Sequence, residues 1–121
     1  FAFTGNKFEF RMLGSSASIS GPNVVINTAV AESLRQYADE LEGADDFENA
    51  LHELICRVIK EHKRIIFSGN GYDDEWVKEA EKRGLLNLPT TPDCVPCYLD
   101  EKNVELFERH GVYTEIELAA R

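Results

Sequence analysis

The sequence is short of cysteine, of positive charge and of long apolar runs, and each shortage excludes a class of protein. Three cysteines among 121 residues are too few for the disulfide framework of a small secreted domain. The chain has 13 Lys and Arg and 22 Asp and Glu, which gives a formal net charge of -9. Proteins that bind nucleic acids or anionic membranes usually carry clusters of positive charge instead. No apolar run approaches the ~20 residues of a membrane-spanning helix. We therefore expect neither nucleic acid nor membrane as a main partner, although one or two cations could still hold a small phosphorylated ligand.

The rest of the composition is that of an ordinary globular domain, with 43% apolar and 29% charged residues. The odd cysteine count and an opening segment unlike a signal peptide favour a reducing, cytoplasmic location. The chain opens at Phe1 without an initiator Met, and only four residues follow the capping box formed by Thr114 and Glu117. We interpret both ends as boundaries inside a longer polypeptide; a frayed C-terminus is the alternative.

Two amphipathic helices are predicted in the first half of the chain. The first runs from Pro22 to about Glu42, and its apolar stripe consists of Ile26, Val30, Leu34, Tyr37 and Leu41. Gly43 ends it, and Asp45 or Asp46 can cap the second helix. The second stripe, also expected to be buried, consists of Phe47, Leu51, Leu54, Ile55, Val58 and Ile59. The short connection predicts an antiparallel helical hairpin.

The second half of the chain has weaker patterns. Residues 64–67 are apolar and β-branched but too few to assign, and residues 68–71 (Ser-Gly-Asn-Gly) form a turn. Asp73 can cap a short helix that Gly84 ends.

Three prolines predict an extended, structured loop over residues 85–99, after which Asp100 caps a helix that reaches Gly111. The fold class that follows is mainly α, a helical hairpin or bundle of about four helices with an N-terminal β-strand.

That strand is predicted over residues 6–13, where two sets of side chains alternate. The charged set is Lys7, Glu9 and Arg11, and the apolar set is Phe8, Phe10 and Met12. A carboxylate among cations can bind a hard metal such as Mg²⁺ or Mn²⁺, and a guanidinium can grip a phosphate or carboxylate with two parallel hydrogen bonds. A solvated strand face with alternating charge is the alternative.

Two further motifs allow several interpretations. Cys94 and Cys97 form a CxxC pair, which fits redox chemistry or half of a zinc site if further ligands lie nearby, or simply two loop thiols. Cys56 belongs to an apolar helical stripe and is expected to be core packing. The turn at 68–71 lacks the Gly-Lys-Ser/Thr of a nucleotide-binding loop.

Three stretches resemble glutamine synthetase of the large, type III class. They are FAFTGNKFEFRMLGSSASISGPN at the start, RIIFSGNGYDDEWVKEAEKRGLLNLPTTPD in the middle and LFERHGVYTEIELAAR at the end. Together they span nearly the whole chain. The first carries the Glu-x-Arg strand that enters the active site in this family, and the second is a mark of the type III class.

The resemblance implies an activity and a set of roles. ATP phosphorylates the side-chain carboxylate of glutamate, and ammonia then displaces phosphate to give glutamine. Glu9 matches a ligand of an active-site Mg²⁺ or Mn²⁺, and Arg11 matches the residue that holds the glutamate side chain and the transferring phosphoryl group. Lys7 has no role carried over. The family's other ligands have no counterpart here, and its members assemble as homo-oligomeric rings.

The resemblance also divides the chain into two regions. Residues 1–21 correspond to a strand and loop of the catalytic domain, and residues 22–121 to a helical C-terminal region. The isolated segment is then expected to be catalytically inert. The alternative function is a non-catalytic helical interaction or oligomerisation module, supported by the amphipathic hairpin.

Overall fold

The computed structural model describes residues 2–3, 8–9 and 16–121. Within them the chain is mainly helical, as predicted, with six α-helices and two 3₁₀ segments rather than about four helices. β1 (Ala2–Phe3) pairs antiparallel with β2 (Phe8–Glu9), so that Ala2 lies opposite Glu9. Most of the strand expected over residues 6–13 lies outside the described residues, and the strand stays a prediction.

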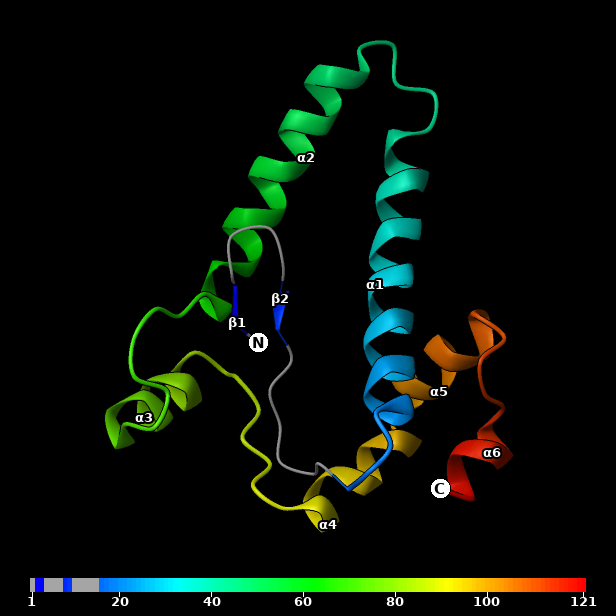
Figure 1. The fold of residues 1–121 in the computed structure, drawn as a ribbon. Coiled ribbons are helices and arrows are strands. Elements are labelled where there is room, and N and C mark those ends of the chain that lie inside the picture. Colours follow the sequence, from blue (N-terminus) through cyan, green and yellow to red (C-terminus); the bar gives the residue numbers. More distant parts are fainter. Residues whose placement is uncertain (1, 4–7, 10–15) are drawn as a thin grey trace.

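The first two helices form the predicted hairpin. α1 (Ser20–Leu41) has 22 residues, and α2 (Phe47–His62) begins where Asp46 accepts a hydrogen bond from the backbone N–H of Asn49 at 3.1 Å. Gly43, in the connection, has a positive φ of 77°. Figure 1 shows the two helices joined at the top and spreading apart below. The guanidinium of Arg57 on α2 contacts both carboxylate oxygens of Glu40 on α1, which ties the helices together near the connection.

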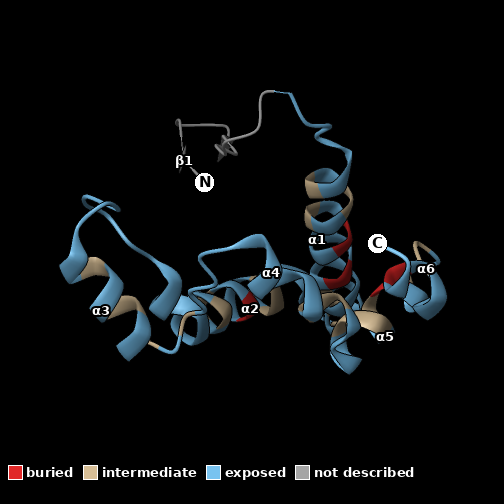
Figure 2. Cartoon of the chain, turned by 90° about the horizontal axis from the view of Figure 1, so that it is seen from below, coloured by how far each residue is buried: buried red, intermediate tan, exposed pale blue. Residues whose placement is uncertain are grey.

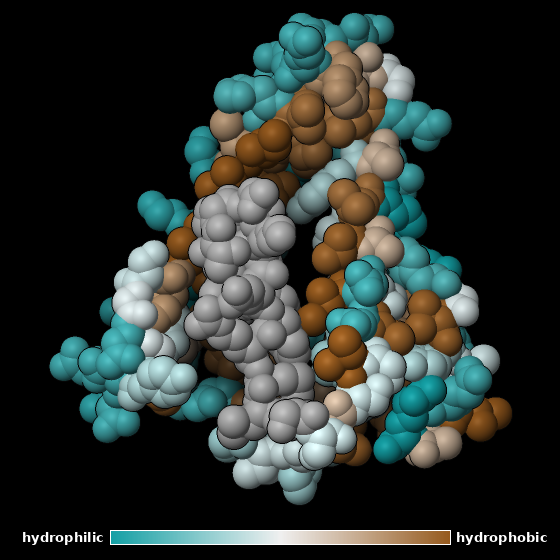
Figure 3. Space-filling model, viewed as in Figure 1, coloured by the Kyte–Doolittle hydropathy of each residue, from teal (hydrophilic) through white to brown (hydrophobic). Residues whose placement is uncertain are grey.

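The apolar stripes of this hairpin are not buried as expected. Leu54 is the buried member of the α2 stripe, whereas Phe47 is 55% exposed. On α1 the buried residues are Thr28 and Glu32, which belong to a different face. The physical reason is that α5 packs on this polar face of α1, while the stripes of the spreading helices border an open groove. Figure 3 shows hydrophobic side chains along α2 and the facing part of α1.

A short helical unit follows the hairpin. The 3₁₀ segment η1 (Lys63–Ile65) continues from α2 and leads to α3 (Asp74–Lys82). Asp73 stands at the N-cap position, but its side chain makes no capping hydrogen bond, contrary to the prediction. Gly84 has a φ of 70°, consistent with its predicted place after the helix.

The segment predicted as an extended loop is largely helical. It contains α4 (Thr91–Cys94) and the 3₁₀ segment η2 (Val95–Leu99). The reason is a capping box in which Thr90 and Asp93 exchange hydrogen bonds, with Pro92 in the first turn, where its missing N–H is tolerated. Pro92 and Pro96 therefore lie in short helical segments, whereas Pro89 precedes them outside any helix.

The last two helices complete a small core. α5 (Glu101–Arg109) is preceded by Asp100, whose side chain makes no capping bond, contrary to expectation. α6 (Glu115–Ala119) begins at the predicted capping box of Thr114 and Glu117. α6 contacts η2 and α5. The buried apolar residues of the described chain are few, as Figure 2 shows, and they are Leu54, Phe107 and Leu118.

Candidate functional site

The site predicted from the sequence lies at the N-terminal end of the chain. Glu9 is the last residue of β2, and its backbone pairs with that of Ala2. The side chain of Glu9, together with Lys7 and Arg11, lies outside the described residues. The proposed metal ligand and phosphoryl-binding guanidinium therefore stay predictions.

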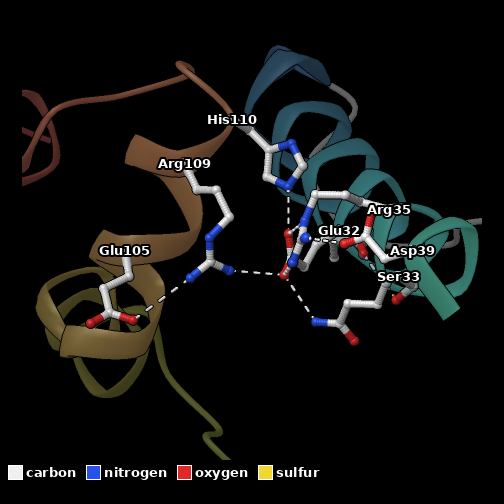
Figure 4. Close-up of polar contacts among 9 residues, drawn as sticks. Glu32, Ser33, Arg35, Asp39, Glu105, Arg109 and His110 are labelled. Atoms are coloured by element: carbon white, nitrogen blue, oxygen red, sulfur yellow. Dashed lines mark hydrogen bonds and ion pairs between the residues drawn. The ribbon is translucent and has the colours of Figure 1, made fainter.

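A different polar cluster is described in detail, and it is centred on Glu32 of α1. We call Glu32, Arg35, Gln36, Arg109 and His110 the Glu32 cluster. Arg35 donates from Nε and Nη2 to the two carboxylate oxygens at 3.1 and 2.8 Å, and Gln36 donates to Oε1 at 2.9 Å. From the end of α5, Arg109 donates to Oε1 at 2.8 Å, and His110 Nε2 lies 2.8 Å from Oε2. Figure 4 shows the side chains of Arg35, Arg109 and His110 converging on the Glu32 carboxylate.

The surroundings of Glu32 keep it ionised. The guanidinium of Arg35, followed by Gln36 and His110, lowers the pKa of the Glu32 carboxyl well below its ordinary value, against the opposing effect of burial. The same carboxylate raises the pKa of Arg35. Because both carboxylate oxygens already accept hydrogen bonds from cations and an amide, the cluster acts as an electrostatic joint between α1 and α5 rather than as a metal ligand.

Sequence reasoning missed this joint. Glu32 and His110 are 78 positions apart, and periodicity reports only which residues share a face of one helix. The available signals were a glutamate on the polar side of a long helix and an Arg-His pair just before Gly111. Neither specifies its partner.

A second cluster supports the segment between η1 and α3, which contains residues 68–71. Arg64 donates to the backbone carbonyls of Arg83 and Gly84, each at 3.2 Å. In return, Arg83 donates to the carbonyl of Ile66 at 3.1 Å, and its guanidinium lies 5.3 Å from the ring centroid of Trp76. Both guanidiniums are thus engaged in bracing η1 against the end of α3.

The same brace contains an aromatic stack and an ion pair. Phe67 stacks on Trp76 with ring centroids 3.7 Å apart. Glu79 accepts from Arg83 Nε at 2.7 Å, and this hydrogen bond lowers the pKa of Glu79. The contacts are those of a folded support for this segment, in which the turn lies at residues 71–72, later than the predicted 68–71, and Asp73 N–H donates to the Asn70 carbonyl at 3.4 Å.

The cysteines and histidines of the described chain do not assemble into a metal centre. All three cysteines are free thiols, and Cys56 Sγ lies 3.6 Å from His52 Nε2 within α2. In residues 2–3, 8–9 and 16–121, no group of three or more His, Cys, Asp or Glu side chains is arranged to hold a metal ion. Over the same residues, no helix combines the length and apolarity needed to cross a membrane.

An open groove lies between α1 and α2, and we call it the hairpin groove. Its volume is about 610 Å³. Apart from Glu42 its lining is apolar or aromatic, and it comprises Leu34, Tyr37, Ala38, Leu41, Phe47, Leu51, Leu54, Ile55, Val58 and Ile59. A surface that is apolar apart from Glu42 and the Tyr37 hydroxyl is suited to binding another apolar surface.

Comparison with known proteins connects this architecture to a family. The family model of the glutamine synthetase C-terminal domain matches residues 50–121, from within α2 to the end of the chain. This chain belongs to the glutamine synthetase family. No solved structure matches it significantly.

Curated relatives extend the similarity over the whole chain. The type-3 glutamine synthetase of Dictyostelium discoideum is 41% identical, and the glutamine synthetases of Butyrivibrio fibrisolvens and Bacteroides fragilis are 39% and 36% identical. Each alignment covers 100% of this chain but only 17% of the relative. The chain thus spans about a sixth of the length of these glutamine synthetases.

The family assignment gives the Glu32 cluster a place in the glutamine synthetase architecture. Arg109 and His110 lie inside the stretch that matches the C-terminal domain, whereas Glu32 precedes it. The cluster therefore fastens the domain to the helix that leads into it.

Proposed function

We propose that this chain acts as part of a glutamate–ammonia ligase that makes glutamine through an acyl phosphate. Membership of the glutamine synthetase family is the observation that carries the proposal, supported by relatives that align over the whole chain. Because the chain corresponds to about a sixth of those relatives, the complete reaction belongs to a longer polypeptide that supplies the other site residues. We further propose that this enzyme is cytoplasmic and assembles as a homo-oligomeric ring.

Within this enzyme, Glu9 and Arg11 have separate roles. The Glu9 carboxylate is a ligand of Mg²⁺ or Mn²⁺, ions that prefer oxygen donors. When bound, the metal offsets the charge on the phosphate oxygens of ATP. Arg11 grips the glutamate side chain and the phosphoryl group with parallel hydrogen bonds, which holds the two reacting groups in register. Residues two apart on a strand point to the same side, so one strand can present both groups to one substrate.

The hairpin groove suggests how the helices support that strand. We assign its occupant as the apolar side of residues 8–12, formed by Phe8, Phe10 and Met12. The groove is open and apolar, which matches this side of the strand in chemistry. The eight residues from Met12 to Ser20 can span at most about 26 Å when extended, and Leu34 lies about 21 Å along α1 from Ser20. The connection is therefore long enough for the strand to reach the groove.

Substitutions in the full-length enzyme test the roles of the two charged residues. Glu9→Gln removes the carboxylate charge at constant size, and we expect the half-saturating concentration of Mg²⁺ to rise at least about tenfold. Arg11→Lys keeps the charge but loses the bidentate geometry, and we expect kcat to fall by about 10²–10³-fold. The measurement is ATP-dependent glutamine formation at varied metal and glutamate.

Lys102→Gln, on the exposed surface of α5, is the matched charge-removal control and should leave both parameters unchanged. Unaltered metal dependence in Glu9→Gln together with unaltered kcat in Arg11→Lys contradicts the assignment. The purified 121-residue chain should show no synthetase activity, and turnover by that chain alone contradicts the claim that the site is shared with other polypeptide.

Groove variants separate this proposal from a purely interacting helical module. Leu34→Gln and Ile55→Gln place amides in the groove, and Ile116→Gln is the control because Ile116 is 82% exposed on α6. If the groove seats the active-site strand, the groove variants lower activity at an unchanged ring size. If they break the assembly while the residual species keeps full specific activity, the groove is an oligomerisation surface.

A further inference from the structure

Cys94 and Cys97 occupy one helical turn, and the proposed function assigns no role to either thiol. Cys94 is the last residue of α4, and Cys97 lies three residues later in η2. The backbone between them is helical, with φ and ψ of −85° and −35° at Cys94 and of −56° and −43° at Val95. Pro96 fixes one further φ near its helical value. The pair is therefore held in a defined turn rather than in the extended loop expected from the prolines.

This turn brings the two Cα atoms within the range of a disulfide. Residues three apart are separated by about 5 Å along an α-helix, from its rise and radius. In a 3₁₀ helix they lie on the same side, about 6 Å apart. Disulfides join Cα atoms about 4.4–6.8 Å apart. The Cα separation therefore falls in the disulfide range in either geometry, and the bond closes once a small adjustment of this short turn brings the two Cβ atoms, about 5–6 Å apart on a regular helix, to about 4 Å.

The two thiols are free and open to reagents. Cys94 is exposed and Cys97 is half-buried. The Cys94 thiol donates a long hydrogen bond of 3.6 Å to the carbonyl of Leu88. Because a thiol is a weak donor, breaking this hydrogen bond to free the sulfur for reaction costs little free energy. Cys56 differs because it lies alone in α2, beside His52.

We propose that Cys94 and Cys97 form a redox-modification site that closes to an intrachain disulfide on reaction with a low-molecular-weight disulfide. The thiolate of the exposed Cys94 attacks one sulfur of the oxidant, forms a mixed disulfide and releases one thiol. The Cys97 thiolate then attacks the Cys94 sulfur, forms the Cys94–Cys97 bond and releases the second thiol. The protein loses two thiol hydrogens, and the oxidant is reduced to two thiols.

The site lies where several elements meet. η2 contacts α4, α5 and α6, and the Cys97 carbonyl accepts a hydrogen bond of 2.6 Å from Asn103 Nδ2 on α5. Cys97 also borders a hollow of about 280 Å³ that Val25 of α1 and Phe107 of α5 line. Because a hydrogen bond from α5 holds the Cys97 backbone, Cys97 stays within one helical turn of Cys94 in the folded chain.

Disulfide mapping of the full chain tests the proposal. The reduced chain is treated with oxidised glutathione, quenched by alkylation and digested with trypsin. Residues 84–102 form one tryptic peptide with both cysteines, and Cys56 falls in another. We expect the first peptide to lose two hydrogen atoms and escape alkylation. Cys94→Ser and Cys97→Ser should each stop at a glutathione adduct on the remaining thiol, and Cys56→Ser should form the disulfide like the unchanged chain.

A second arm tests the role of the folded turn. In urea the helical turn is lost, and we expect the ratio of intrachain disulfide to glutathione adduct at equilibrium to fall several-fold. Three results overturn the proposal: both thiols alkylated after oxidation, adducts that do not proceed to the intrachain bond, or a ratio that urea leaves unchanged.

Discussion

Truncation of Phe107 tests whether the small core beside α5 holds the helical region together. The side chain is 4% exposed, and its ring lies 5.5 Å from that of Tyr113 at an interplanar angle of 50°. It also borders the hollow lined by Val25 and Ala29 of α1, so it touches the joint between the hairpin and the C-terminal helices.

The structure sets the size of the effect. Phe→Ala at a buried site costs about 3–5 kcal/mol, of which the aromatic pair accounts for about 0.5–1.5 kcal/mol. Phe47→Ala makes the same chemical change where the side chain is 55% exposed. Full burial of a phenylalanine contributes about 1.5–3 kcal/mol, so this control should cost about 1 kcal/mol. In a chain of this length the two variants should lower Tm by about 10–30 °C and about 3–6 °C respectively.

Urea unfolding followed by far-UV circular dichroism and by the fluorescence of Trp76 measures both variants. Trp76 is the only tryptophan, so its fluorescence reports on the packing around α3, whereas circular dichroism reports on the helix content of the whole chain. Equal midpoints for Phe107→Ala and Phe47→Ala, with equal slopes, refute the reasoning, because burial then does not separate the two positions.

The remaining predictions concern the α1–α5 joint and the hairpin connection. The pKa of Glu32 is lowered from its ordinary 4.5, so the carboxylate stabilises the fold above that pH and loses this contribution as the pH falls below it. Glu32→Gln should therefore be less stable than the unchanged chain near neutrality, with a gap that narrows on acidification; a gap that widens in acid contradicts the assignment. Gly43→Ala forces a side chain into a φ of 77° and should cost about 1–2 kcal/mol in urea titrations, whereas Gly71→Ala, where an added Cβ meets no atom within 4 Å and φ is not left-handed, should stabilise by up to about 1 kcal/mol. Equal midpoints for the two alanines contradict the strain argument.

The helix ends were the most predictable features because their signals are local. Asp46 accepts from the backbone three residues ahead, and Thr114 and Glu117 exchange hydrogen bonds within one turn. Gly43 and Gly84 adopt positive φ close to the ends they mark. Each of these depends on residues within about four positions, so the sequence alone contains the whole interaction.

Features that depend on distant partners escaped prediction. The apolar stripe of α1 recurs at helical spacing along the helix, yet α5 packs instead on the side of Thr28 and Glu32. Periodicity identifies an apolar face but does not say which element covers it. The proline-rich segment was predicted wrongly for a different reason. Its prolines favoured an extended loop over the two short helical segments that the structure has, and the capping box at Thr90 uses Asp93, where Glu or Gln is usual.

The two faces of α1 have different physical consequences for the glutamine synthetase fold. The polar face is satisfied within this chain, since the Glu32 carboxylate receives hydrogen bonds from α1 and from the end of α5. Such an ionic joint fixes the register of two helices more than it stabilises them, because desolvating the charges offsets much of their attraction. The apolar face, in contrast, leaves Leu34 61% exposed at the hairpin groove. Covering this face would remove apolar surface from water and so stabilise the hairpin further. It follows that the stability of the hairpin should respond to whatever fills the groove, while the α1–α5 joint should persist with the groove open.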